Sequence, residues 1–287
     1  MRLVKVLWIV PIILALHSCE EVLPTRVVTA SVDSTFVTSS IPSAQSKVVL
    51  FEEYTGASCV NCPDGHRIVK DILTQYGNKV IAVGLHPAGN VLAAPVHTGE
   101  EFRTEEAKLI ANNFKVSSLP SGTIDRKDFD GSIVQGRFVW KQKLESVINN
   151  PVKVNAKSRV YFDDLSGKTL LELEYTILED IDNDLNFSIM LIENKLVAPQ
   201  KEGSEVREEY VHEHVMRKMY TNALGNALKK ETADAGGYKK GRVYLKKIEL
   251  EDFSKTKYKA ENLYIVSFIT NASNSEVLQA SSAKVKN

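Results

Sequence analysis

The chain has 287 residues, of which 43% are hydrophobic, enough to bury one large core or two modest ones. Its 36 basic residues balance 36 acidic ones, and no local basic patch stands out, so nucleic acid is not an expected partner. Only three cysteines occur, and two of them, Cys59 and Cys62, form a C-x-x-C motif.

The N-terminus has the three parts of a secretory signal peptide. A basic start and an apolar run over residues 6–16 are followed by small Ser18, just before Cys19. The apolar run is too short to span a bilayer, which takes about 20 residues. Residues 16–19 also resemble the lipobox of bacterial lipoproteins, in which cleavage before the cysteine follows lipid transfer to its sulfur. We therefore expect a signal peptide over residues 1–18 and lipidation of Cys19, with ordinary cleavage leaving a free thiol as the alternative.

Lipidation of Cys19 makes membrane lipid the first expected partner. The several acyl chains of a lipoprotein anchor a protein firmly without a membrane span, since each buried methylene contributes about 0.8 kcal/mol. Residues 19–46 are rich in serine and lack helical periodicity, so we expect a flexible tether. Glu20 and Glu21 resemble a signal for surface display in some Gram-negative lipoproteins; a merely solvated tether is the alternative.

The next segment predicts a strand, a helix and a second strand. Continuous apolar runs at residues 48–51 and 80–85 are typical of buried strands. Between them, apolar residues recur at helical spacing up to Tyr76, and Gly77 is placed to end the helix as a left-handed cap. Such a unit has a right-handed crossover and parallel strands.

The C-x-x-C motif lies where this helix starts. Pro63 is tolerated only in a first helical turn, so the helix N-terminus must lie close to Cys59 and Cys62. Free amides and the positive end of the helix dipole lower the pKa of a thiol there. The motif thus indicates a thioredoxin-like redox pair, with Cys59 as nucleophile and Cys62 resolving the mixed disulfide. A permanent Cys59–Cys62 disulfide is the alternative, and no metal is expected because zinc would need further ligands.

Two more positions are similar to the thioredoxin superfamily. Pro120 stands where that superfamily has a cis-proline beside the disulfide, before an edge strand. Glu53, six residues before Cys59, matches the buried carboxylate that moves protons for the resolving cysteine. Glu52 could be the inward residue instead, or both acids could face solvent.

An insertion separates the strand-helix-strand unit from Pro120. Residues 87–99 show little regularity, and His86 before them is expected to be a surface or hydrogen-bonded residue rather than a ligand. Thr104 is a suitable N-cap for a helix over residues 105–115, which has acidic residues in its first turn.

Pro151 follows another predicted helix and marks the expected domain boundary. Beyond it the hydrophobic period changes to two, and six or seven short strands in about 135 residues predict an antiparallel sandwich. One strand is expected over residues 206–219, where His212 and His214 would point to the same face. Two imidazoles do not make a metal site, so we expect none.

Several of these segments together resemble a family of envelope lipoproteins named after a twenty-eight-kilodalton outer-membrane protein (Omp) of Gram-negative bacteria. The resemblance rests on the lipobox-like end, residues 53–63, Leu119-Pro120, and the strand with His212 and His214. It covers nearly all of the mature chain and is most specific over residues 54–63. It implies a lipoprotein of the cell outer membrane with a thioredoxin-like domain and a family-specific β domain.

The expected fold class is an α/β thioredoxin-like domain followed by a mainly antiparallel β-sandwich domain. The expected order is the signal peptide (1–18), the tether (19–46), the thioredoxin-like domain (47–150) and the β-sandwich-like domain (151–287).

Two functions fit this organisation. One is a lipid-anchored thiol-disulfide oxidoreductase acting on envelope proteins, with Cys59, Cys62, Glu53 and Pro120 as its catalytic site. The other is a surface binding or adhesion lipoprotein that uses the thioredoxin-like domain as a scaffold and holds a structural disulfide. Neither function requires a cofactor.

Overall fold

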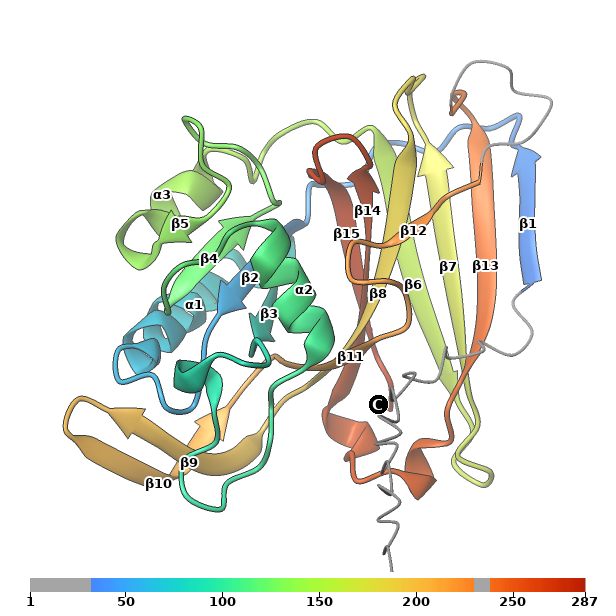
Figure 1. The fold of residues 1–287 in the computed structure, drawn as a ribbon. Helices are drawn as coiled ribbons and strands as arrows, with labels where there is room; N and C mark the ends of the chain where they lie inside the picture. The colour runs from blue at the N-terminus through green and yellow to red at the C-terminus, as the bar shows by residue number, and fades with distance from the viewer. Residues whose placement is uncertain (1–31, 230–237, 287) are drawn as a thin grey trace, which may run out of the picture.

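The computed structural model describes residues 32–229 and 238–286, and it is mainly β with few helices (Figure 1). The predicted signal peptide and the predicted lipidation site, Cys19, lie outside the described residues. The helices are α1 (Cys62–Tyr76), α2 (Glu105–Asn113) and α3 (Trp140–Glu145), with short 3-10 turns η1 (Gly77–Lys79), η2 (Val91–Ala93), η3 (Arg137–Val139), η4 (Phe253–Lys255) and η5 (Ala260–Asn262). Within the described ranges, no helix has the length and apolar character that crossing a membrane requires.

The strands fall into three sheets. They are β1 (Val32–Val37), β2 (Val49–Tyr54), β3 (Val80–Leu85), β4 (Ser121–Ile124), β5 (Gln135–Gly136), β6 (Val154–Phe162), β7 (Thr169–Ile177), β8 (Leu185–Glu193), β9 (Leu196–Glu202), β10 (Glu205–His212), β11 (Val215–Met219), β12 (Asn226–Ala227), β13 (Arg242–Leu250), β14 (Leu263–Asn271) and β15 (Val277–Lys284). In the described part of the chain the largest sheet runs β15-β14-β8-β11-β3-β2-β4-β5, with β12 beside β8. A four-stranded sheet runs β1-β13-β7-β6, and β9 pairs with β10 alone.

The predicted strand-helix-strand unit is present. Strands β2 and β3, which precede and follow α1 in the chain, pair with each other in parallel, and every residue of β2 is buried. Pro63 lies in the first turn of α1, and Gly77 caps its end at a φ of 55°. β4 and β5 extend the sheet in antiparallel fashion beyond β2. The sheet is covered by helices on both faces (Figure 1), because α1 and α3 share one apolar cluster with β2 while α2 contributes to another.

The predicted helix of the insertion is also confirmed. The Thr104 hydroxyl accepts a hydrogen bond from the Ala107 amide and so caps α2. Ala107 and Ile110 on the inner face of α2 are fully buried. The helix therefore covers the sheet face opposite α1.

In the C-terminal part, two antiparallel layers face each other. The four-stranded sheet and the strands β8 and β14 contribute residues such as Leu173, Tyr175, Ile189 and Ile265 to one apolar cluster. Burial on β7 alternates, as the period of two predicts. The layers stand side by side at the right of Figure 1.

The predicted flexible tether differs from the structure in its second half. Residues Val32–Val37 form β1, which pairs with β13 over its whole length. Further on, the Gln45 amide donates to Asn155 Oδ1, and the Asn155 side chain donates to the Ser43 carbonyl. The serine-rich composition of the segment gives no indication of this strand pairing, because an edge strand needs backbone hydrogen bonds more than apolar side chains.

The single strand predicted over residues 206–219 is wrong. It is split into β10 and β11, because His214 has a φ of 59° and turns the chain between them. After the turn, β11 pairs with β8 and also lies parallel to β3, with Val215 opposite Gly84. The Gly84 amide donates to the His214 carbonyl at 2.8 Å. The C-terminal strands thus continue the sheet of the N-terminal unit.

Candidate functional site

Cys59 and Cys62 form a disulfide at the N-terminus of α1. Their Cα atoms are 5.4 Å apart, and Cys62 is the first residue of the helix. The free amides of the first turn and the helix dipole therefore act on the sulfur of Cys62. This is the placement that the motif predicts.

The disulfide is buried, so the predicted nucleophile Cys59 is not open to solvent. Cys59 is 2% exposed and Cys62 is fully buried. On one side, the Ser58 amide donates to the Leu92 carbonyl of η2. A Cβ at Gly56 would lie 2.3 Å from Ala93 Cα, so the loop before the motif packs directly on η2.

A hairpin from the C-terminal half covers the other side of the motif. We call β9 and β10 with their turn, residues 196–212, the cover hairpin. The Lys201 amide donates to the Ala57 carbonyl at 2.9 Å, and the Gly203 amide donates to the Val60 carbonyl at 3.2 Å. The buried Gln200 side-chain amide donates to the carbonyls of Gly56 and Cys59 at 3.2 and 3.1 Å. Burial of the cysteines thus depends on a segment about 140 residues away in the chain.

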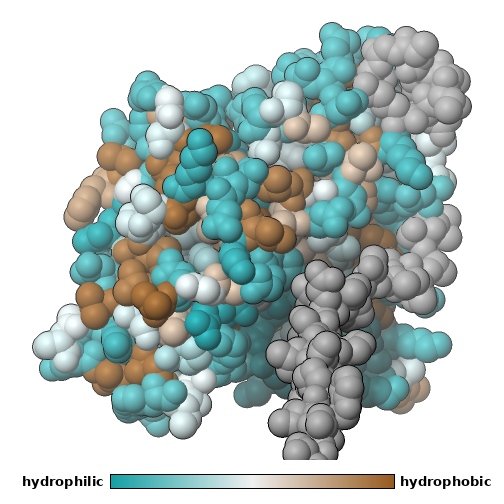
Figure 2. Space-filling model, in the orientation of Figure 1, coloured by the Kyte–Doolittle hydropathy of each residue, from teal (hydrophilic) through white to brown (hydrophobic). Residues whose placement is uncertain are grey.

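Large hydrophobic side chains remain exposed around the covered motif. They include Val60 in the motif itself, Val91 and Leu92 on η2, and Val197 on the cover hairpin. Figure 2 shows hydrophobic side chains scattered among hydrophilic ones over the half of the molecule that holds the N-terminal unit.

The two acids of β2 have different surroundings. Glu52 is fully buried and accepts hydrogen bonds from the Arg126 guanidinium at 2.6 and 2.9 Å and from the Thr123 hydroxyl at 2.7 Å. Glu53 is 5% exposed, and its Oε1 has no hydrogen-bond partner among the described residues. Burial raises the pKa of Glu53 well above its ordinary value. Glu53 is therefore the acid available for proton transfer, whereas Glu52 neutralises Arg126.

Glu53 and Pro120 lie against the first turn of α1. A Cβ at Gly65 would lie 2.5 Å from Glu53 Oε1 and 3.2 Å from Pro120 Cβ, so both side chains pack closely on the helix here. The Leu119-Pro120 peptide bond is cis, as expected from the position of Pro120 in the sequence. The structure thus gathers Cys62, Glu53 and Pro120 around one helical turn.

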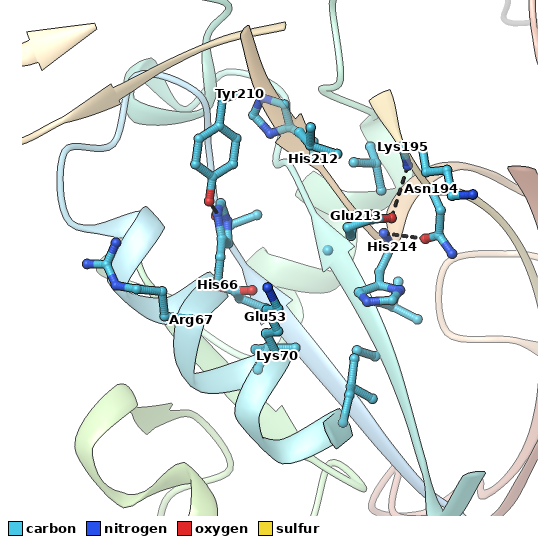
Figure 3. Close-up of a pocket in the computed structure, with 18 of the residues that line it drawn as sticks. Glu53, His66, Arg67, Lys70, Asn194, Lys195, Tyr210, His212, Glu213 and His214 are labelled. Carbon is cyan, nitrogen blue, oxygen red and sulfur yellow. Dashed lines mark hydrogen bonds and ion pairs between the residues drawn. The ribbon is translucent and has the colours of Figure 1, made fainter. Parts of the chain in front are cut away.

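A pocket of about 860 Å³ opens beside α1 (Figure 3). Glu53 lines it, and so do four histidines and a tyrosine, namely His66, His86, His212, His214 and Tyr210. We call this pocket the histidine cavity. Its walls come from β2, α1, β3, the cover hairpin and the turn after it. The cover hairpin therefore both shields the disulfide and forms one wall of the cavity.

Hydrogen bonds fix two rings of the cavity. His66 lies between Thr55 and Tyr210, with Nε2 2.8 Å from Thr55 Oγ1 and Nδ1 2.8 Å from Tyr210 Oη. Nε2 of His212 donates to the Ala198 carbonyl at 3.2 Å. The contact between His66 and Tyr210 ties α1 to the cover hairpin across the cavity, whereas the contact between His212 and Ala198 lies within the hairpin.

Burial keeps the histidines of the cavity uncharged. It lowers the pKa of His66 to about 3 and the pKa of His212 and His214 to about 4. The pKa of His86 also lies well below its ordinary value, chiefly because of desolvation. Neither ring nitrogen of His86 has a hydrogen bond of standard geometry among the described residues. The sequence predicts His86 to be a surface or hydrogen-bonded residue. In the structure His86 is instead buried, and its ring packs against Phe102.

The described residues contain no group of three or more histidine, cysteine or acidic side chains placed to hold a metal ion. His212 and His214 do not share a strand face, because β10 ends at His212 and the chain turns at His214.

Sequence reasoning missed the histidine cavity as a whole. Its members come from segments that lie far apart in the chain, and each histidine alone has the signature of an ordinary polar residue. The available signal was the position of His66, one helical turn after Cys62 on the predicted helix.

Two solved structures, those with TM-scores above 0.5, share the fold of this chain. HBP35 of Porphyromonas gingivalis superimposes with a TM-score of 0.63 at 16% identity, over 84% of this chain and 76% of that one. A protein of Agrobacterium tumefaciens gives 0.51 at 12% identity, over 85% and 97% of the two chains. A domain of the outer membrane lipoprotein Omp28 from P. gingivalis gives 0.31 at 20% identity, over 47% and 89%.

A family comparison goes further than these structural likenesses. No curated protein sequence matches the chain. The family model described as outer membrane protein Omp28 matches residues 107–287, which is well over half of the chain. The protein therefore belongs to the Omp28 family and is an outer-membrane protein.

Proposed function

We propose that the protein is a lipid-anchored lipoprotein that exchanges disulfides with other envelope proteins through Cys59 and Cys62. One observation carries the proposal: the first turn of α1 begins at the disulfide-bonded Cys62, and at Gly65 it packs against the Glu53 carboxyl, whose Oε1 has no hydrogen-bond partner among the described residues. A buried acid of raised pKa beside a thiol pair is suited to giving and taking a proton during exchange. The anchor would be lipid on Cys19, as the lipobox-like segment indicates.

The topology of the N-terminal unit supports a thioredoxin-like fold for this part. The order β3-β2-β4-β5, with β2 and β3 parallel and β4 and β5 antiparallel, fits that fold, as do helices on both faces. The C-x-x-C at the start of α1 and a cis-proline directly before β4 match its active-site positions.

In the proposed reaction a client dithiol is the reductant. One client thiolate attacks Cys59 Sγ, the bond between the two protein sulfurs breaks, and its electron pair moves to Cys62 Sγ, which takes the proton of Glu53. The second client thiol, after losing its proton to solvent, attacks the client sulfur of the mixed disulfide. Cys59 leaves as a thiolate, stabilised by the helix N-terminus. The client is oxidised by two electrons and the Cys59–Cys62 pair is reduced.

Exchange requires the cover hairpin to move away from Cys59. Away from the motif the hairpin is held by the hydrogen bond between Tyr210 and His66, by the ion pair between His97 and Glu208, and by the packing of Ala198 in an apolar cluster with Phe102. Next to the motif its contacts are polar: the amides of Lys201 and Gly203, the Gln200 side chain, and an ion pair of 2.6 Å between Arg67 and Glu202. Each is worth about 1 kcal/mol, because water replaces it on opening. The exposed valines around the motif would then contact the client.

The test is trapping with Cys62→Ser, in which Cys59 keeps its thiol and Cys62 can no longer release a client from a mixed disulfide with Cys59. We expect adducts on non-reducing gels of envelope extracts, and more of them in Cys62→Ser with Gln200→Ala, which loosens the cover. Cys59→Ser with Cys62→Ser is the control and should give none. If neither trapping variant gives adducts beyond this control in oxidising or reducing medium, exchange on envelope proteins is ruled out.

One observation favours a second function. Both cysteines are almost fully buried, as they would be in a scaffold stapled by a structural disulfide and used for surface binding or adhesion. The two functions differ in reduction potential: catalytic pairs lie at about −120 to −270 mV, and structural disulfides below about −300 mV. Equilibration of the folded protein with a graded glutathione or dithiothreitol buffer measures which range applies.

A further inference from the structure

Glu53 needs a route for its proton. Its carboxyl is buried, and the first turn of α1 closes one side of it. The other side faces the histidine cavity, which Glu53 lines. Among the described residues, the only basic side chain within 4.0 Å of this carboxyl is His66, whose Nε2 lies 3.9 Å from Oε1.

The His66 ring is held in a defined orientation between the acid and the cavity. Tyr210 Oη, 2.8 Å from Nδ1, donates to this nitrogen when the ring carries its proton on Nε2. Nε2–H then faces Thr55 Oγ1 and the Glu53 carboxyl. Figure 3 shows Glu53, His66 and Tyr210 following one another from β2 across α1 to the cover hairpin.

Other histidines of the cavity are less suited to this role. Nε2 of His212 is engaged with the Ala198 carbonyl, and the centre of its ring lies 6.4 Å from that of His66. Lys70 also lines the cavity, but it forms no ion pair with Glu53 within 4.0 Å. The geometry therefore singles out His66.

We propose, building on the proposed disulfide exchange, that His66 relays protons between the Glu53 carboxyl and the water of the histidine cavity, with Tyr210 fixing the ring. After Glu53 gives its proton to Cys62 Sγ, the carboxylate takes the proton from His66 Nε2. Nδ1 takes a proton from Tyr210 Oη, which water in the cavity reprotonates. Water in the cavity then takes the proton of Nδ1 and gives one to Nε2, which returns the ring to its first tautomer, and each group ends with the proton it started with.

The relay predicts that exogenous imidazole restores His66→Ala. The substitution opens the cavity further, and an imidazole molecule fits the vacated space. The measurement is single-turnover reduction of the folded protein's Cys59–Cys62 disulfide by dithiothreitol, quenched with an alkylating agent. We expect the rate to fall about a hundredfold, within the range for loss of a proton-transfer group. Added imidazole should raise it in proportion to imidazole concentration, with a pH dependence that follows the added base.

Two further variants separate relay from packing. Leu165→Ala shortens an almost fully exposed side chain in the turn between β6 and β7, away from the histidine cavity and the cover hairpin; its rate should equal that of the parent. His66→Gln keeps a polar side chain of similar size, so a packing role predicts a rate near that of the parent, whereas the relay predicts a rate close to that of His66→Ala.

The outcomes distinguish the relay from the reaction it serves. If dithiothreitol does not reduce the parent disulfide while the protein stays folded, the proposed function fails. If the parent is reduced and His66→Ala reacts equally fast, or if imidazole does not restore it, the relay alone is overturned.

Discussion

Replacing His212 by phenylalanine should make the protein less sensitive to acid. Burial holds the pKa of His212 at about 4, while in the unfolded chain it titrates near 6.5. Between these two pH values the unfolded chain binds more protons than the folded one, so the free energy of unfolding falls as pH falls. The stabilising contribution of neutral His212 is complete above about pH 6.5 and is lost on acidification toward the folded-state pKa.

The size of this effect follows from the two pKa values. Between pH 7 and pH 5, His212 alone removes about 2 kcal/mol from the free energy of unfolding. Phenylalanine does not titrate, and it can keep the edge contacts of the ring with Phe102 and Tyr210, at 4.8 and 4.9 Å between centroids. It loses the hydrogen bond to the Ala198 carbonyl, which costs about 1 kcal/mol at every pH.

The assay is urea denaturation of parent and variant at pH 7 and pH 5. We expect the variant to be about 1 kcal/mol less stable at pH 7 and about 1 kcal/mol more stable at pH 5. Other groups that titrate in this window, including Asp125 with its pKa raised to about 6 by burial, are present in both proteins and cancel in the comparison. Leu165→Ala, which changes an almost fully exposed side chain and removes no titratable group, is the control and should lose stability in parallel with the parent. If His212→Phe also runs parallel to the parent, His212 is not a buried neutral histidine and the reasoning fails.

Two further predictions concern packing around the acids of β2. Arg126→Met leaves the buried Glu52 carboxylate unpaired and should cost about 3–5 kcal/mol in urea denaturation, whereas Arg126→Met combined with Glu52→Leu should cost less than that single change. If the double variant is the less stable, the pair is not a mutually dependent buried ion pair. Gly65→Ala crowds Glu53 Oε1 and should lower stability by about 1 kcal/mol, the balance of overpacking against better helix propensity. Gly136→Ala, where a Cβ would meet nothing within 4 Å, is its control; equal stability of the two would contradict the close packing of Glu53 on α1.

Features encoded by neighbouring residues could be predicted from the sequence. Pro63 fixed the start of α1, Gly77 its end, and Thr104 the start of α2. In each case the signal and the structure it specifies lie within one helical turn, so no distant segment can override them. The disulfide followed from the same local pattern at Cys62.

Features that depend on distant segments were not predictable in this way. The burial of Cys59 is produced by Gln200 and its neighbours in the cover hairpin, and no residue near the motif indicates that this hairpin covers it. The choice between Glu52 and Glu53 could not be made either, because β2 is buried on both faces and alternation carries no information there. It is Arg126, from the loop after β4, that separates their roles.

The pairing of β11 with β3 has a consequence for dissecting the protein. An excised fragment ending near residue 150 would have a bare β3 edge, with the Gly84 amide deprived of its acceptor. It would also lose Met190, Met216 and Phe268 from the apolar cluster that they share with the N-terminal unit. The same cut would remove the cover hairpin and uncover the sulfur atoms. Such a fragment would be prone to self-association, and its thiol reactivity would describe a surface that the intact chain keeps hidden.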